Sequence, residues 1–345
     1  MFPAANAIFW VLIFMTTSET NGYSEQDRTG ADPRGRKAHA PSEMPAKGWK
    51  DILYRVYLSV QQDRVTLIAA GASFYLLLAL FPGLAAFVSI YGFFADRASV
   101  AANMSSLAGV LPDDSINLIR TQLESLATQD TKALSVSFVV GLAIALWSAN
   151  NGSKAIFEAL NVAYGETEKR SFIKLNLVSL AFTLGVMLAG AILLSVLAGL
   201  PPLLDRMGAG GWLTTSIRIL RWPVMLLLVG AGISIAYRIG PDREAAQWRW
   251  VSWGAAFAIL AWVIASAAFT FYLSNFSDYN ATYGALGAVA GLMIWMWISV
   301  TILILGAELN AELEHQTTVD TTTGRARPMG HRSAVVADTL GESSD

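Results

Sequence analysis

Long apolar stretches alternate with polar segments along most of this chain. Six of them are long enough to be membrane spans, at residues 66–95, 133–150, 173–199, 222–238, 251–273 and 284–307. A helix needs about 20 mostly apolar residues to cross the hydrocarbon core of a bilayer. The cores of the six stretches contain no charged residue and no histidine. The pattern therefore predicts an all-α integral membrane protein with six transmembrane helices.

The lysines and arginines beside these stretches predict the orientation. An even number of spans puts both termini on one side of the membrane. Near the spans, 13 Lys and Arg residues fall on that side and 6 on the other. Because cytoplasmic loops carry the excess of Lys and Arg, both termini are predicted to be cytoplasmic.

Three shorter segments, 49–60, 113–128 and 153–164, place their apolar residues on one face of a helix. The first carries Trp49 and Ile52 on that face and Lys50 on another. Amphipathic helices of this kind lie in the membrane interface. We predict short interfacial helices that either cap the bundle or form a gate or lipid-headgroup platform.

The two ends of the chain differ from its middle. Residues 18–46 are rich in Ser, Gly, Pro, Ala and charge, and the C-terminal segment is polar with a run of threonines. Such compositions do not bury enough apolar surface to fold. The predicted organisation is a disordered or dispensable extension at 1–46, a six-helix membrane domain at 47–314 and a disordered cytoplasmic tail at 315–345.

The composition excludes several function classes. Hydrophobic residues make up 54% of the chain and charged residues only 14%, against roughly 25% charged residues in soluble domains. This excludes an ordinary soluble enzyme. A net charge of −2 excludes a generally basic nucleic-acid binder. Because the chain has no cysteine, it has no disulfide, thiolate metal site or thiol nucleophile.

An acidic cluster after the sixth stretch is the one candidate for metal or acid–base chemistry. Glu308 and Glu312 share a helix face, and Glu314 and His315 follow. We interpret the cluster as a solvated helix end rather than a metal site, because no motif elsewhere completes it. No catalytic, cofactor-binding or metal-binding residue is predicted. The charge-free span cores also argue against a proton-coupled carrier.

Polar and helix-breaking residues near the span ends are candidates for a transport path. Asn150 and Asn151 lie at the end of the second stretch, where they either cap the next helix or line a cavity. Tyr279 and Tyr283 lie on the opposite side, as interface anchors or path residues. Pro82 interrupts the first stretch, so we expect a kink or break there.

Five segments, in order, resemble the YihY/BrkB integral membrane family, whose members have carried a ribonuclease label. They are A-A-G-A-S-F-Y-L-L-L-A-L-F-P-G-L at 69–84, L-W-S-A-N-N-G-S-K-A-I-F-E-A-L-N-V-A-Y at 146–164, A-Y-R-I-G-P at 236–241, Y-N-A-T-Y-G-A-L-G at 279–287 and I-L-G-A-E-L-N-A at 304–311. The positions that match the family pattern include Phe74, Tyr75, Pro82, Trp147, Ser148, Tyr164, Tyr237, Pro241, Tyr279, Tyr283, Gly284, Gly306, Glu308 and Asn310. The chain departs from the family in Ala79, where serine is more usual, and in its long N-terminal extension.

The resemblance implies a six-span bacterial inner-membrane protein. Some family members are linked to serum resistance, as virulence factors, and others to envelope lipid export. The leading hypothesis is therefore a transporter or flippase-like protein for a lipid or other amphiphile. The alternatives are a non-transporting scaffold for envelope proteins and, less favoured, a membrane-associated hydrolase or ribonuclease.

The expected partners follow from the same hypothesis. They are membrane lipids, with no nucleic acid and no cofactor, and envelope proteins if the chain is a scaffold. Gly287-x-x-x-Gly291 fits close helix packing, and it is compatible with a homodimer.

Overall fold

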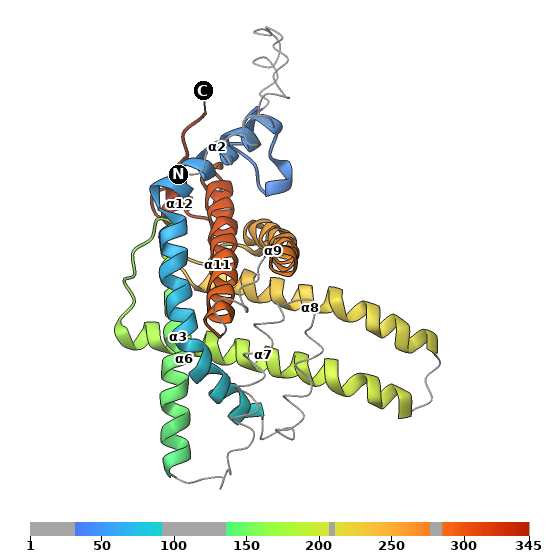
Figure 1. Ribbon diagram of the computed structural model, residues 1–345. Coiled ribbons are helices and arrows are strands. Elements are labelled where there is room, and N and C mark those ends of the chain that lie inside the picture. The colour runs from blue at the N-terminus through green and yellow to red at the C-terminus, as the bar shows by residue number, and fades with distance from the viewer. Residues whose placement is uncertain (1–31, 92–135, 207–210, 277–284, 345) are drawn as a thin grey trace.

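The computed structural model describes residues 32–91, 136–206, 211–276 and 285–344 (Figure 1). Apart from one isolated bridge between Ala246 and Thr322, the regular structure of these ranges is helical. The elements are η2 (Pro41–Glu43), α2 (Ala46–Gln62), α3 (Val65–Tyr91), α6 (Val136–Ala163), α7 (Phe172–Arg206), α8 (Gly211–Ile239), α9 (Trp248–Phe276), α11 (Ala285–His315) and α12 (Val335–Asp338). The prediction of an all-α protein is confirmed for the described residues.

Five of the described helices are long and apolar enough to cross a membrane. They are α3, α7, α8, α9 and α11. The predicted span at 133–150 belongs to α6, which does not meet that criterion, so six spans are not confirmed. The five candidates also differ in direction, since α3 and α11 run along the vertical of Figure 1 while α7 and α8 run across it.

Helix α6 corrects one prediction. The segment 153–164 is not a separate interfacial helix, because α6 continues unbroken through Asn150, Asn151 and Gly152 to Ala163. Packing against α3 overrides the low helix propensity of these residues. A Cβ on Gly152 would lie 3.0 Å from the Ala79 Cβ atom, so the absence of a side chain lets α3 and α6 approach closely.

Two other sequence predictions concern helices near the ends of the spans. The predicted helix at 49–60 lies within α2, whereas the segment 113–128 lies outside the described residues.

Helix α3 stays helical through Pro82, and its second half turns away from the axis of the first in Figure 1. A bend rather than a break is the outcome that an internal proline commonly produces.

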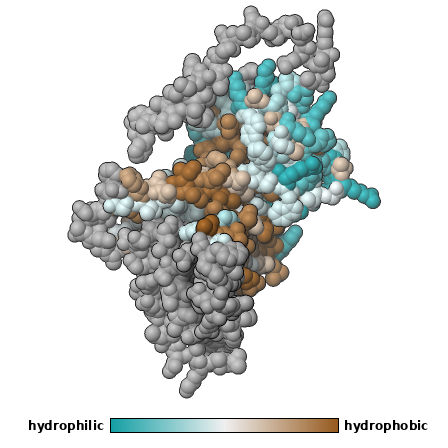
Figure 2. All heavy atoms as spheres, turned by 90° about the vertical axis from the view of Figure 1, so that its right-hand side faces the viewer, coloured by the Kyte–Doolittle hydropathy of each residue, from teal (hydrophilic) through white to brown (hydrophobic). Residues whose placement is uncertain are grey.

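Residues 32–62 and 316–344 form a polar cap over one end of the helices, in contrast to the disorder that we expected for much of both segments (Figure 2). Gln316 and Thr317 are fully buried. The Gln316 amide donates to the Arg34 carbonyl at 2.7 Å, and the Thr317 hydroxyl donates to the Ala38 carbonyl at 2.8 Å. The two segments order each other through hydrogen bonds, a source of stability that composition does not reveal.

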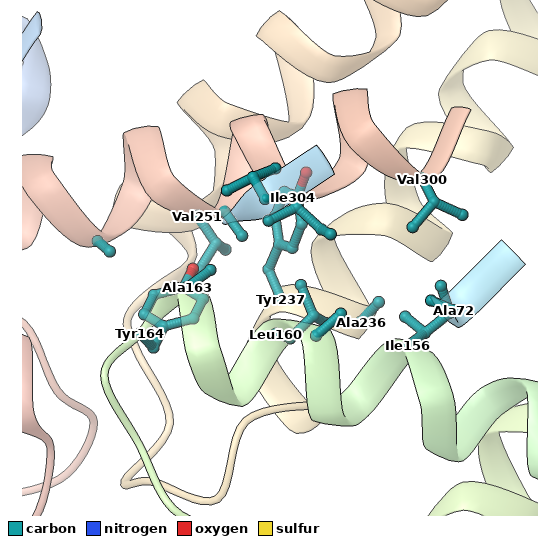
Figure 3. Close-up of a cluster of buried hydrophobic side chains, with 14 of the residues drawn as sticks. Ala72, Ile156, Leu160, Ala163, Tyr164, Ala236, Tyr237, Val251, Val300 and Ile304 are labelled. Carbon is teal, nitrogen blue, oxygen red and sulfur yellow. The ribbon is translucent and has the colours of Figure 1, made fainter. Parts of the chain in front are cut away.

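The apolar core lies between the long helices (Figure 3), and Val336 of α12, in the cap, packs into the same cluster. Leu160 from α6, Tyr237 from α8 and Ile304 from α11 are almost fully buried there. Ala72 from α3 and Val251 from α9 complete the contact between the helices. Burying these side chains fixes the helix ends that carry the candidate functional residues.

Candidate functional site

The candidate residues fall into two regions of the described structure. The first, called the junction here, joins α6, α8, α9 and α11 beneath the polar cap and contains Tyr164, Tyr237, Pro241, Glu308 and Asn310. The second, called the pocket, lies between α3, α6 and α7. Tyr279, Tyr283 and Gly284 lie outside the described residues.

Asn310 is buried in the junction and joins α11 to α9. Its side-chain oxygen accepts a hydrogen bond from the Gly254 amide at 2.7 Å, and its side-chain nitrogen donates to the Val251 carbonyl at 3.1 Å. An added Cβ on Gly254 would overlap the Gly306 carbonyl oxygen. The two helices therefore cross closely at Gly254 and Gly306. Between the described helices of this single chain, the close packing expected at Gly291 is not seen, because a Cβ there would meet nothing within 4 Å.

A buried ion pair lies next to these contacts. The guanidinium of Arg243 is 2.7 Å from the carboxylate of Glu314, and their side chains are 2% and 0% exposed. The hydroxyl of Thr321, in the polar cap, donates to the same carboxylate at 2.6 Å. Burial alone would lower the pKa of Arg243, but the adjacent Glu314 carboxylate outweighs it and raises that pKa. Arg243 therefore stays charged and ties the segment between α8 and α9 to α11, while Thr321 ties the cap to the same carboxylate.

Aromatic residues of the junction pack around this pair. The Arg243 guanidinium lies 5.0 Å from the centre of the buried Tyr164 ring. Burial, together with the Glu314 charge, raises the pKa of the Tyr164 phenol above its usual value. The Tyr237 hydroxyl donates to the Leu303 carbonyl at 2.7 Å. Tyr164 and Tyr237 therefore hold helices together and are closed to solvent.

The acidic cluster at the end of α11 is buried, so the prediction of a solvated helix end is wrong. Glu308 and Glu314 are 1% and 0% exposed. Arg55 of α2 lies 2.5 Å from the Glu312 carboxylate and also donates to Gln316 at 2.8 Å. The cap therefore supplies the partner of Glu312, because Arg55 lies far from it in the sequence. Among the described residues, no group of three or more His, Cys, Asp or Glu side chains could hold a metal ion.

The pocket is a cavity of about 460 Å³ at the cap-side ends of α3, α6 and α7. This volume falls within the usual range for small-molecule sites. Its lining combines apolar residues with a few polar ones. The lining residues are Ile68, Gly71, Ala72 and Tyr75 of α3, Asn151, Lys154, Ala155, Glu158 and Ala159 of α6, and Leu175 of α7.

Lys154 is the cation of the pocket, and α7 and an aromatic ring position it. Its ammonium donates to the Asn176 side-chain oxygen at 3.2 Å and lies 5.2 Å from the centre of the Trp147 ring. The Asn150 amide donates to the same Asn176 oxygen, also at 3.2 Å. Burial lowers the pKa of Lys154, since the charged form loses hydration.

The structure brings some of the predicted path residues together and separates others. Tyr75 and Asn151 line the pocket, while Trp147 and Asn150 contact it through Lys154 and Asn176. Pro82 and Ser148 are partly buried and do not line it.

The sequence analysis did not select Lys154 or Glu158. Their spacing could have indicated them, because Lys154 follows Asn151 by three residues, Glu158 follows Lys154 by four, and residues three and four apart share a helix face.

Comparison with known proteins identifies the family. The family model described as virulence factor BrkB matches residues 56–330. The chain belongs to this family. The resemblance found in the five sequence segments is thereby confirmed, and the protein is a membrane protein with several apolar helices.

Individual relatives of this BrkB-family protein carry two kinds of name. A protein of Bacillus subtilis, YfkH, named ribonuclease-like, is 33% identical over 269 residues, which is 76% of this chain and 94% of YfkH. The UPF0761 membrane protein Nmul_A0452 of Nitrosospira multiformis is 28% identical over 279 residues, which is 76% of this chain and 61% of that protein. No solved structure matches the chain.

Proposed function

We propose that this BrkB-family protein is a transporter or flippase-like protein of the bacterial inner membrane, acting on a lipid or other amphiphile. The pocket carries the proposal. Its wall on α3 and α7 is apolar apart from the Tyr75 hydroxyl, and its other polar groups, on Asn151, Lys154 and Glu158, all come from α6. An amphiphile needs this combination, because its tail and its headgroup require different surroundings.

The location of the pocket supports entry from the inner leaflet. Its residues lie at the ends of α3, α6 and α7 that face the polar cap. The excess of Lys and Arg on this side favours a cytoplasmic cap and cytoplasmic termini. The pocket would then open at the level of inner-leaflet headgroups, where Trp147 and Lys154 are suited to the membrane interface.

The larger cavity, of about 990 Å³, suits an amphiphile less well. It lies between the segment that precedes α7 and the tail around α12. Much of its charge is already paired, since Arg170 bonds Glu168 at 2.6 Å and Arg243 bonds Glu314. We therefore place lipid contact in the pocket and not in this cavity.

We also propose that the protein is not a nuclease. The ribonuclease-like name belongs to YfkH. Glu312 and Glu314 are paired with arginines of the same fold, and Glu308 is only 1% exposed, so RNA has no open route to these acids. RNA hydrolysis by the purified protein that is lost in Glu308→Gln would contradict this statement.

The test is a leaflet-exchange assay. The protein is reconstituted in liposomes that carry phospholipids with a fluorescent label on the acyl chain, and a membrane-impermeant quencher reports the fraction in the outer leaflet. We expect faster exchange than in protein-free liposomes. Tyr75→Ala and Asn151→Ala should each lose most of this increase in rate. Leu227→Ala serves as the control, because Leu227 is 73% exposed on α8, away from the pocket.

Two results would overturn the proposal. One is exchange no faster than in protein-free liposomes, in which case stable co-purification of an envelope protein would favour the scaffold function. The other is full activity in both pocket variants.

A further inference from the structure

The pocket carries two opposite charges that no charged residue in the described part of the chain neutralises. Lys154 and Glu158 both line it, one helical turn apart on α6, which is about 6 Å along the helix axis. Within the described residues, neither side chain is within ion-pair distance of an opposite charge, including each other. Residues at this spacing often pair across the helix surface. Here the two charges remain free for a ligand.

Contacts on the other side of Lys154 explain why it does not pair with Glu158. The ammonium is drawn toward α7 and the Trp147 ring by the contacts at 3.2 Å and 5.2 Å. Both contacts are uncharged, so they position the cation without neutralising it. A partly buried cation gains most from a ligand that brings a negative charge.

Glu158 favours a ligand that carries a positive charge. It is exposed at the pocket edge and lies next to Ala155 and Ala159, which offer no competing donor. A carboxylate there attracts an ammonium group and repels additional negative charge. A ligand that satisfies both residues therefore carries one anionic and one cationic group, joined by a short linker.

The rest of the pocket indicates where such a ligand continues. Asn151 on α6 supplies an amide donor and acceptor, and Tyr75 on α3 supplies a hydroxyl. The lining also includes Ile68, Ala72 and Leu175, whose apolar side chains suit an acyl chain or glycerol backbone. These apolar residues favour a lipid over a free phosphate ester.

We propose that the pocket selects a zwitterionic headgroup with one phosphate and one primary amine, of the phosphatidylethanolamine type, over headgroups with a net negative charge. Lys154 binds the phosphate and Glu158 binds the amine. This inference rests on the proposed function, because it names the class of lipid that the same pocket takes.

The experiment compares two lipids in the same leaflet-exchange assay. Phosphatidylethanolamine and phosphatidylglycerol are both labelled on the acyl chain, so that the amine stays intact. We expect the wild-type protein to exchange phosphatidylethanolamine about fivefold faster, the ratio that one exposed ion pair can supply. The ratio should fall toward one in Glu158→Gln, while Lys154→Gln should slow both lipids.

Matched controls carry the same substitutions outside the pocket. Lys47→Gln in α2 and Glu342→Gln in the tail remove exposed charges from the polar cap, and both should keep the wild-type ratio. Water-soluble phosphoethanolamine should inhibit exchange more strongly than glycerol phosphate. Equal inhibition by the two compounds would overturn the inference.

The remaining outcomes separate failure of the inference from failure of the proposed function. Equal exchange of both lipids, lost in Asn151→Ala but unchanged in Glu158→Gln, overturns headgroup selection and leaves lipid transport standing. Exchange of neither lipid above the protein-free rate overturns the proposed function itself. Uptake of phosphoethanolamine without lipid exchange identifies a soluble ligand and also overturns the lipid assignment.

Discussion

The junction and the pocket use the same helix in opposite ways. At the end of α6, Tyr164 is fully buried beneath Arg243, whose charge is paired with Glu314. Two turns or so earlier, Lys154 and Glu158 face a cavity with no ion-pair partner among the described residues. The charges of Arg243 and Glu314 are satisfied within the protein, although the Tyr164 hydroxyl and one Glu308 carboxylate oxygen of the junction have no hydrogen-bond partner among the described residues, whereas the charges of the pocket have no opposite charge to pair with there.

This contrast separates residues that hold the fold from residues that are able to bind. Tyr237 and Asn310 match the family pattern, yet their polar atoms bond the backbone of neighbouring helices. Tyr75 also matches it, but its side chain is 52% exposed at the pocket. A match to the family pattern therefore does not by itself mark a functional residue.

The largest effect on stability is expected from Arg243→Met. Removing one partner leaves the buried Glu314 carboxylate uncompensated, which should cost about 3–5 kcal/mol of unfolding free energy. The measurement is thermal unfolding of the purified protein in mild detergent. The tail should also become more sensitive to proteolysis, because the carboxylate that accepts the Thr321 hydrogen bond is no longer held by Arg243.

Two further variants test whether the pair is responsible. Arg325→Met removes an exposed arginine of the tail and should unfold like the wild type. Arg243→Met combined with Glu314→Leu should recover part of the loss, because it removes the unpaired charge. An unchanged unfolding temperature in Arg243→Met would show that the junction is not held by this pair.

The apolar pattern predicted most of the long helices, and long-range polar contacts explain where it failed. Helices α3, α7, α8, α9 and α11 correspond to predicted stretches. The order of the tail was not predicted, because Gln316 and Thr317 bond residues about 280 positions earlier. Periodicity reports only on local structure, so it contains no information about such contacts.

Gly254→Ala is expected to lower the stability less than Arg243→Met does. The added Cβ would overlap the Gly306 carbonyl oxygen and the Asn310 side chain, so α9 and α11 would have to move apart. Overpacking of this kind costs about 1–3 kcal/mol, again measured by thermal unfolding in detergent.

Gly232→Ala on α8 is the matched control. A Cβ at Gly232 meets nothing within 4 Å, and alanine has the higher helix propensity. Its unfolding temperature should therefore be equal to or above that of the wild type. Equal unfolding temperatures of Gly254→Ala and Gly232→Ala would mean that the close crossing at Gly254 does not contribute to stability.

The candidate site was predicted in part. Asn151 and Tyr75 were selected from polarity and from the family pattern, and both line the pocket. Lys154 and Glu158 were missed, since a charge after an apolar stretch is usually solvated. Their importance depends on α7, whose Asn176 holds Lys154 in place, and the sequence alone does not show that α7 packs there.

The smallest effect on stability, and the sharpest contrast with the junction, is expected from Asn151→Ala. The residue is partly exposed and lines an open cavity, so its truncation should change the unfolding free energy by no more than about 0.5 kcal/mol. Lipid exchange should nevertheless fall. Thermal unfolding and leaflet exchange, measured on the same preparation, show whether Asn151 contributes to lipid exchange or to stability. A loss of stability as large as that of Gly254→Ala would place Asn151 with the residues that hold the fold, and the pocket would then be a packing defect rather than a binding site.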